Sequence, residues 1–277
     1  MIIDAHVHVL PARVRDNMPA VTAADPWFAA CHRKRTAVAS VSSLLDAMDA
    51  AGIDRAICFT WPFADPALCA EGNDFLAAAV RAHPDRLIGF GVVQPARDGA
   101  AHEVERCARL GLRGIGEMNA DAQGWSLEDD AALAPVVAAS VAADLPWTLH
   151  GSELVGHTHA GKGTATPDRI AGFAERYEQL RVIGAHLGGG LPLHAHMPEI
   201  RRLCRRMWFD TAAVPYLYEP TVYRAVIDLC GAGRLLLGTD HPLLDLPRYR
   251  SGFEAAGLAR AEIAAVMGGS AAQLLGL

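Results

Sequence analysis

The sequence has few lysines and few aromatic residues, and it lacks a long uninterrupted apolar run. Of its 277 residues, 20% are charged and 6% are aromatic, and its lysines are Lys34 and Lys162 alone. The longest stretch without Asp, Glu, Lys or Arg runs from Val182 to Pro198 and is interrupted by three histidines and two prolines. A membrane-spanning helix needs about 18 or more mainly apolar residues. We therefore expect no membrane segment.

Cysteine pairs and targeting signals are also missing. The six cysteines contain no C-x-x-C pair, and the chain starts with Met-Ile-Ile-Asp-Ala-His rather than a basic segment followed by an apolar run. This predicts reduced thiols in a cytoplasmic protein. The net charge of −6 argues against nucleic acid or an anionic membrane as the partner and leaves small molecules as candidates.

What the chain does have is alternation. Short apolar runs rich in Ile, Val, Leu and Phe are separated by longer Ala/Leu/Arg-rich stretches with helical periodicity. The predicted strands are Ile2–Ala5, Arg55–Thr60, Leu87–Val93, Arg113–Gly116, Leu145–Leu149, Arg181–Ala185, Met207–Asp210 and Leu235–Gly238. Eight strands alternating with helices indicate a parallel sheet, and the chain length favours a closed (β/α)8 barrel formed by residues 1–277 as one domain.

The alternative, an open doubly wound sheet, requires a phosphate-binding glycine loop after its first strand. No G-x-G-x-x-G motif follows that strand here. The long segment Val9–Val41, with Pro11, Pro19 and Pro26, is interpreted as an elaborate first loop and a candidate lid.

Polar residues that could carry chemistry terminate five of the predicted strands. In a barrel, the carboxyl-terminal strand ends converge over the axis, so residues from distant parts of the chain meet there. The five ends read Asp4-Ala5-His6-Val7-His8, Gly116-Glu117, Thr148-Leu149-His150, Gly184-Ala185-His186 and Gly238-Thr239-Asp240-His241-Pro242.

The histidines of the first strand predict a metal site. His6 and His8 are two residues apart, and side chains of a strand repeat with a period of 2, so both imidazoles point to one side. Adding His150 and Asp240 gives three nitrogen ligands and one carboxylate oxygen. Such a set suits Zn²⁺ first, with Mn²⁺, Fe²⁺ or Ni²⁺ also allowed. An open position would hold a water molecule whose pKa the metal lowers to about 7.

These motifs together resemble the amidohydrolase superfamily. They span Asp4 to Pro242, and the last three, L-H-G, A-H-L-G-G-G and G-T-D-H-P, are most similar to the amidohydrolase-related branch. That branch includes the aminocarboxymuconate-semialdehyde decarboxylases. The resemblance implies a metal held by His6, His8, His150 and Asp240. It also implies that His186 is either a proton donor and substrate polariser or a ligand of a second metal.

Glu117 bears on whether one or two ions bind. Many binuclear members of the superfamily carry a carboxylated lysine at the fourth strand, and neither Lys34 nor Lys162 ends that strand. Glu117 could bridge two metals instead, or could orient a ligand histidine without touching a metal. The sequence leaves both alternatives open.

The first functional hypothesis is a metal-dependent hydrolase that cleaves an amide, lactone or ester of a small molecule, including cyclic ones. Asp240 would accept the proton of the activated water and return it to the leaving group, and His186 would stabilise the oxyanion. The alternative is metal-dependent decarboxylation of an unsaturated or aromatic acid. A third hypothesis is a metal-binding protein without catalytic activity.

Further residues are candidates for contact with a small-molecule substrate. Trp61 could form a pocket wall, and His157 and His241 lie in loops after strands. The arginines Arg13, Arg33 and Arg35 of the first loop could clamp a carboxylate. For assembly, a homodimer is the default expectation.

Overall fold

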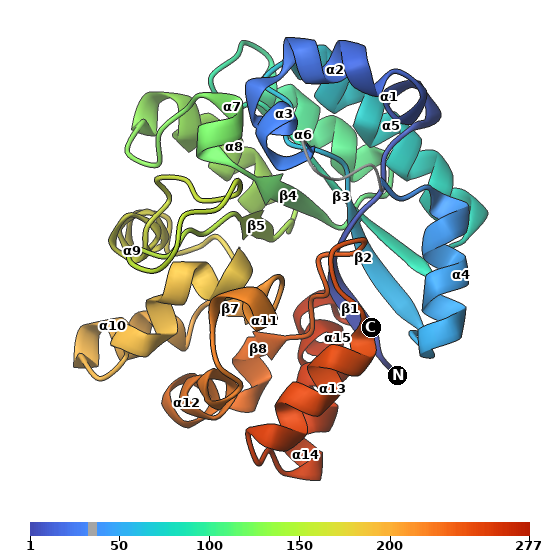
Figure 1. Ribbon diagram of the computed structural model, residues 1–277. Helices are drawn as coiled ribbons and strands as arrows, with labels where there is room; N and C mark the ends of the chain where they lie inside the picture. The colour runs from blue at the N-terminus through green and yellow to red at the C-terminus, as the bar shows by residue number, and fades with distance from the viewer. Residues whose placement is uncertain (33–37) are drawn as a thin grey trace.

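The computed structural model describes residues 1–32 and 38–277. Eight strands follow one another around a parallel sheet in chain order (Figure 1). They are β1 (Ile3–His8), β2 (Arg55–Phe59), β3 (Leu87–Gly91), β4 (Gly114–Met118), β5 (Trp147–Leu149), β6 (Val182–Gly184), β7 (Trp208–Asp210) and β8 (Leu235–Leu236). Each matches one of the predicted runs, although β1 extends as far as His8.

The sheet closes between its first and last strands. The amide of Ala5 donates to the carbonyl of Leu237 at 2.6 Å, and the amide of His8 donates to the carbonyl of His241 at 2.9 Å. Val7 and His241 form a parallel bridge at this seam. The predicted (β/α)8 barrel is therefore confirmed.

Helices surround the strands and also extend the loops. The α-helices are α1 (Ala12–Asp16), α2 (Met18–Ala24), α3 (Pro26–His32), α4 (Val41–Ala51), α5 (Pro66–Ala82), α6 (Ala100–Arg109), α7 (Ala120–Gln123), α8 (Asp130–Ala142), α9 (Pro167–Arg176), α10 (Pro198–Cys204), α11 (Val214–Leu217), α12 (Thr221–Cys230), α13 (Leu246–Ala255), α14 (Arg260–Ala264) and α15 (Ser270–Leu275). Tighter or wider turns occur at 185–194, 232–234 and 265–269. Among the described residues, no helix is long and apolar enough to cross a membrane.

Apolar side chains fill the barrel in two layers. The inner layer includes Ile3, Ile57, Phe59 and Phe90, and α15 closes its lower end with side chains such as Leu274. The outer and larger layer lies between strands and helices. Burial of apolar area on both faces explains why the strands read as nearly continuous apolar runs. The polar residues that remain are concentrated at the upper strand ends.

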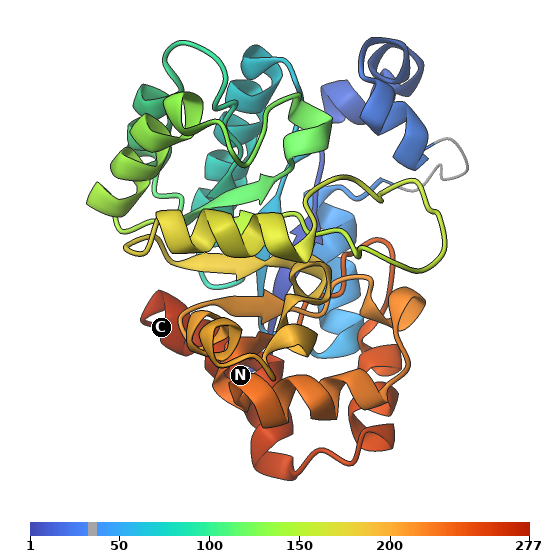
Figure 2. The ribbon, with the colours of Figure 1, turned by 90° about the vertical axis from the view of Figure 1, so that its left-hand side faces the viewer.

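Two long segments lie on the side of the barrel toward which the strands point (Figure 2). The first loop carries α1 to α3, where Phe28 packs with Leu10 and Phe63 in a small apolar cluster. The second segment, residues 151–166, follows β5. The thiol of Cys31 in α3 lies 3.7 Å from the carbonyl oxygen of Ala160, so the two segments meet above the strand ends.

Candidate active site

The two histidines of β1 meet an aspartate from the loop after β8. The Nε2 atoms of His6 and His8 are 3.1 Å apart. The Oδ1 atom of Asp240 is 3.8 Å from Nε2 of His6 and 3.7 Å from Nε2 of His8. The two imidazoles of β1 therefore lie on the same side of the strand, as its period of two residues predicts. The carboxylate of Asp240 lies next to them.

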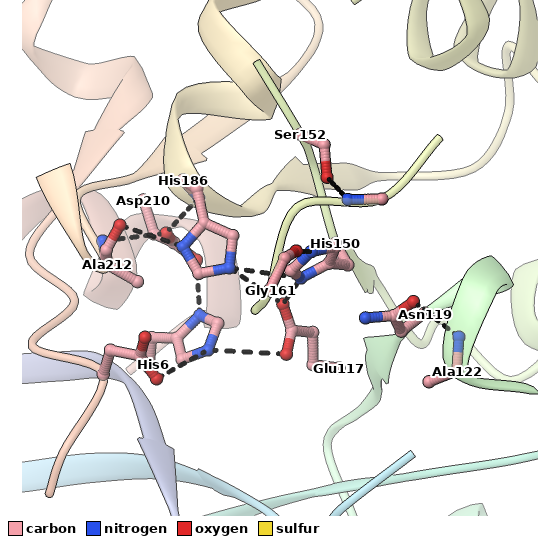
Figure 3. A network of polar contacts seen from close by, with 12 residues as sticks. His6, Glu117, Asn119, Ala122, His150, Ser152, Gly161, His186, Asp210 and Ala212 are labelled. Carbon is pink, nitrogen blue, oxygen red and sulfur yellow. Dashed lines mark hydrogen bonds and ion pairs between the residues drawn. The ribbon is translucent and has the colours of Figure 1, made fainter. Parts of the chain in front are cut away.

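Glu117, near the end of β4, lies beside this group, and Figure 3 shows its carboxylate between the rings of His6 and His150. Its Oε2 atom is 3.5 Å from Nε2 of His8 and 3.8 Å from Nε2 of His6. Its Oε1 atom contacts Nδ1 of His150 at 2.8 Å and Nε2 of His186 at 3.2 Å. One carboxylate thus links histidines from three different strand ends.

His150 lies beside this cluster rather than in it. Its Nδ1 atom faces Glu117, and its Nε2 atom is 2.9 Å from the carbonyl oxygen of Gly161 in the loop after β5. Two groups of possible metal ligands occur among the described residues: one is His6, His8 and Asp240, and the other is His6, Glu117 and His186. His150 belongs to neither, so the predicted set of four ligands is only partly assembled in this geometry.

Asp210, the last residue of β7, was missed by the sequence analysis. Its Oδ2 atom accepts a hydrogen bond from Nδ1 of His6 at 2.8 Å. Its Oδ1 atom accepts from the backbone amides of His186 at 2.9 Å and Ala212 at 3.0 Å. The carboxylate is fully buried and fixes two of the candidate residues at once. Because it terminates an apolar run, the rule that identified Glu117 and Asp240 would also have found it.

The backbone after β6 sets the position of His186. Residues 186–190 all have positive φ, from 55° at His186 to 95° at Gly190. Such a left-handed stretch favours glycine, which supplies three of the five residues. A Cβ atom on Gly189 would lie 2.3 Å from the carbonyl oxygen of Ser152. The glycines therefore permit a close approach between this turn and the loop after β5.

Opposing charges shift the ionisation of the cluster. Burial favours a neutral imidazole at His6, but the carboxylates of Asp210 and Glu117 raise the pKa of His6 to about 10. Burial also lowers the pKa of His186, but the carboxylate of Glu117 outweighs this effect and raises the pKa of His186 to about 9. Burial alone would raise the pKa of Glu117, but His150 and His6 hold it well below its usual value.

The donor set fits a divalent cation. A hydrogen bond to Asp210 places the proton of neutral His6 on Nδ1, and a contact of 3.2 Å with the carbonyl oxygen of Thr60 does the same for His8. Both Nε2 atoms are then lone-pair acceptors, and they face each other and the carboxylates of Glu117 and Asp240. Four acceptors around one point require a positive charge. A proton on His6 supplies it in the metal-free protein, and a metal ion can replace that proton.

A cavity of about 820 Å³ opens above the cluster. Trp61, His157 and His241 line it, as the sequence analysis expected of a substrate pocket, and burial lowers the pKa of His241. Arg13 does not line it and instead pairs with Glu71. Arg33 and Arg35, the other arginines considered as carboxylate clamps, lie outside the described residues.

The family model for the amidohydrolases matches residues 3–277, so the chain belongs to the amidohydrolase family. The resemblance found in the strand-end motifs is thereby confirmed.

Particular relatives of this chain are decarboxylases. Gamma-resorcylate decarboxylase from Polaromonas sp. (strain JS666 / ATCC BAA-500) is 27% identical over 256 residues, which cover 75% of this chain and 76% of the relative. The structure of 5-carboxyvanillate decarboxylase from Sphingomonas paucimobilis is 19% identical and has a TM-score of 0.80, with 100% of this chain and 99% of that chain covered.

A third similar protein was solved with ligands. The 5-carboxyvanillate decarboxylase from Novosphingobium aromaticivorans, complexed with manganese and 4-hydroxy-3-methoxy-5-nitrobenzoic acid, is 21% identical with a TM-score of 0.81. The comparison covers 100% of this chain and 96% of that chain.

The expectation of a hydrolase is wrong, because gamma-resorcylate, 5-carboxyvanillate and 2,6-dihydroxybenzoate decarboxylases are among the proteins similar to this chain. The preference for zinc is likewise not supported, since the neighbours with a stated metal hold manganese. The physical reason is that imidazoles and carboxylates around a cation serve both chemistries. The strand-end motifs therefore predict the metal site but not the bond that is broken.

Proposed function

We propose that this protein is a divalent-metal-dependent decarboxylase of a hydroxylated aromatic carboxylic acid. The observation that carries the proposal is that the Nε2 atoms of His6 and His8 lie within 3.8 Å of the carboxylates of Glu117 and Asp240, beside a cavity with tryptophan in its wall. The activity of the relatives supports decarboxylation as the reaction.

The ion would be held by His6, His8 and Asp240, with Glu117 and His186 beside it. The manganese in related structures and the mixed nitrogen and oxygen donors favour Mn²⁺. When bound, the metal supplies a positive charge that favours the ionised form of a phenol group and draws electron density from the carboxylate. His150, whose Nδ1 atom is 2.8 Å from Oε1 of Glu117, is the further candidate ligand.

The chemistry that the residues must support is a proton transfer followed by C–C cleavage. A proton adds to the ring carbon that bears the carboxylate, the bond between that carbon and the carboxylate breaks, and its electron pair returns to the ring as CO₂ leaves. The reaction consumes one proton and needs no oxidant or reductant.

Two side chains are placed to handle charge during these steps. Asp240 is 18% exposed, and its carboxylate lies beside the histidines of β1 and lines the cavity, where it can carry the proton to the ring carbon. His186, whose pKa Glu117 raises to about 9, lines the cavity and can donate a hydrogen bond to negative charge on the substrate. Trp61 and Trp27 line the cavity and exclude water from the flat faces of a ring.

The test uses chain loaded with Mn²⁺ and a panel of hydroxybenzoic acids that includes 2,6-dihydroxybenzoate and 5-carboxyvanillate. We expect CO₂ release together with the matching phenol. We also expect the phenol alone to take up deuterium from D₂O at the ring position that loses the carboxylate, because the protonation step is reversible.

Asp240→Asn should lower the rate by about 10²-fold or more, the scale of a lost acid–base group. Asp245→Asn, at the exposed start of α13, is the matched control and should leave the rate unchanged. Wild-type protein that releases no CO₂ and exchanges no ring proton with any member of the panel would overturn the proposal.

A further inference from the structure

Asn119 is a buried amide at the edge of the cavity. It follows β4 directly, two residues after Glu117, lines the cavity and is 2% exposed. Its side chain caps the short helix α7, because Oδ1 accepts a hydrogen bond from the amide of Ala122 at 3.0 Å. Only the oxygen of the side-chain amide can accept, so this bond fixes the –NH₂ group on the other side.

That –NH₂ group points toward the polar cluster around Glu117 and His150 (Figure 3). Within 1–32 and 38–277, no residue accepts a hydrogen bond from it. Since this nitrogen is not among the fully buried polar atoms that lack a partner, it is accessible from the cavity, where water or a ligand can accept from it. The orientation points to a ligand that supplies the acceptor.

The backbone around Asn119 is held firmly. Its amide donates to Oε1 of Gln123 at 3.4 Å, and its carbonyl accepts from the amide of Gln123 at 3.0 Å. The Nε2 atom of Gln123 in turn donates to the carbonyl of Val93 at 2.7 Å. The donor is thus fixed before any ligand arrives, which lowers the entropic cost of using it.

We propose that Asn119 determines substrate specificity by donating a hydrogen bond to an oxygen substituent on the aromatic ring, away from the reacting carboxylate. This inference rests on the proposed function. Glu117 and Asn119 are two residues apart on extended backbone and project to the same side. At about 3.3 Å per residue, Asn119 stands roughly 6–7 Å above Glu117, so it meets the far side of a ring whose carboxylate lies at the cluster.

The chemistry of the amide defines the preferred substituent. An N–H donor suits a hydroxyl or a methoxy oxygen equally well, because both accept. It gives no advantage to a ring that carries hydrogen at that position, since such a ring displaces water from the donor and offers no acceptor in its place. We therefore expect hydroxyl- and methoxy-substituted acids to be preferred over the unsubstituted acid by about tenfold or more.

Asn119→Asp is the sharpest test, because aspartate keeps the cap on α7 but exchanges the donor for an acceptor. A carboxylate can accept from a hydroxyl group and can offer nothing to a methoxy group. The ratio of kcat/KM for the hydroxyl acid to that for the methoxy acid should rise about tenfold or more. Asn119→Ser also keeps a cap, but its side chain is too short to reach the ring. It should remove the advantage of both substituents and leave the unsubstituted acid unchanged.

Binding keeps this test independent of turnover. The dissociation constants of the matching phenols, followed by quenching of tryptophan fluorescence, should show the same pattern as kcat/KM. Asn17→Asp, at the exposed start of α2, adds the same charge far from the cavity and should change neither readout. Variants at position 119 that weaken all three acids equally, or none, would overturn the inference. Absence of CO₂ release with the expected binding pattern would overturn the proposed function alone.

Discussion

Asp210 and His6 form a buried pair in which Oδ2 of the carboxylate accepts from Nδ1 of the imidazole at 2.8 Å. Both side chains have no exposed surface. The pair fixes the ring so that Nε2 faces His8, Asp240 and the cavity. A carboxylate behind a ligand histidine orients the ring and raises its basicity, and such partners matter almost as much as the ligand itself.

Asp210→Asn should therefore weaken Mn²⁺ binding by about 10–100-fold, because the amide holds His6 less firmly and lowers its basicity. Titration of the metal-free protein with Mn²⁺ measures the change. Asp228→Asn, on the exposed face of α12, is the matched control and should bind as tightly as the wild type. Equal affinity of the Asp210 variant and the wild type would contradict the positioning role.

The stability of the metal-free protein should fall as pH rises from 6.5 to 8.5. Folding raises the pKa of His6 from 6.5 to about 10 and that of His186 from 6.5 to about 9. The folded state therefore holds these protons more tightly than the unfolded chain does. Their contribution is complete below pH 6.5 and is lost as pH rises through the folded pKa values.

Urea unfolding in the presence of EDTA at several pH values between 6.5 and 8.5 would measure the slope of the free energy of unfolding against pH. His6→Asn should reduce it, whereas His102→Asn, exposed on α6, should not. A flat or rising profile for the wild type would contradict the shift. Mn²⁺ competes with the same protons, so its affinity should rise with pH over this range.

One metal ion should bind per chain. The two possible ligand groups share His6, and its Nε2 is the atom near both Glu117 and Asp240. Since Nδ1 is occupied by Asp210, a single lone pair serves both groups and cannot bind two ions. Metal quantification should give about one Mn²⁺ per chain, and Glu117→Gln should lower the affinity without lowering the stoichiometry at saturation. Two ions per wild-type chain would refute this arrangement.

Gly189→Ala should destabilise the protein more than Gly111→Ala. Both glycines have positive φ, at 64° and 84°, so both variants carry the penalty of about 1–2 kcal/mol for a left-handed residue with a side chain. Only at Gly189 would the new Cβ collide with the carbonyl oxygen of Ser152. Overpacking adds about 1–3 kcal/mol. Thermal unfolding measures the decrease in Tm for each variant. Equal decreases would show that the turn at residues 186–190 rearranges to accommodate the new Cβ atom.

The strands could be predicted because burial on both faces makes them apolar and glycine, proline or polar residues end them. The pairing of His6 with His8 followed from the period of the strand. The end of β1 was set too early, at Ala5, because the polar motif interrupts the apolar pattern although the backbone remains extended to His8.

The rest of the site depends on tertiary geometry. Asp210 ends an apolar run as Glu117 and Asp240 do, but only the folded structure shows that it holds His6 and His186. Asn119 looks like an ordinary turn residue until its partners are known. His150 directly follows β5, yet it faces Gly161 and Glu117 rather than His6 and His8, because the loop after β5 offers it a carbonyl group. The reaction depends on which substrate the cavity binds, and the strand-end motifs do not determine the substrate.

The distance along the chain between the cluster's members constrains the order of events during synthesis. Its residues extend from position 6 to position 240, and the seam between β1 and the segment after β8 joins them. A ribosome-bound chain therefore cannot assemble this group of side chains before residue 240 has emerged. Loading of a metal ion at this site must therefore follow synthesis of the segment after β8, and a product truncated before Asp240 would carry the histidines of β1 without that carboxylate.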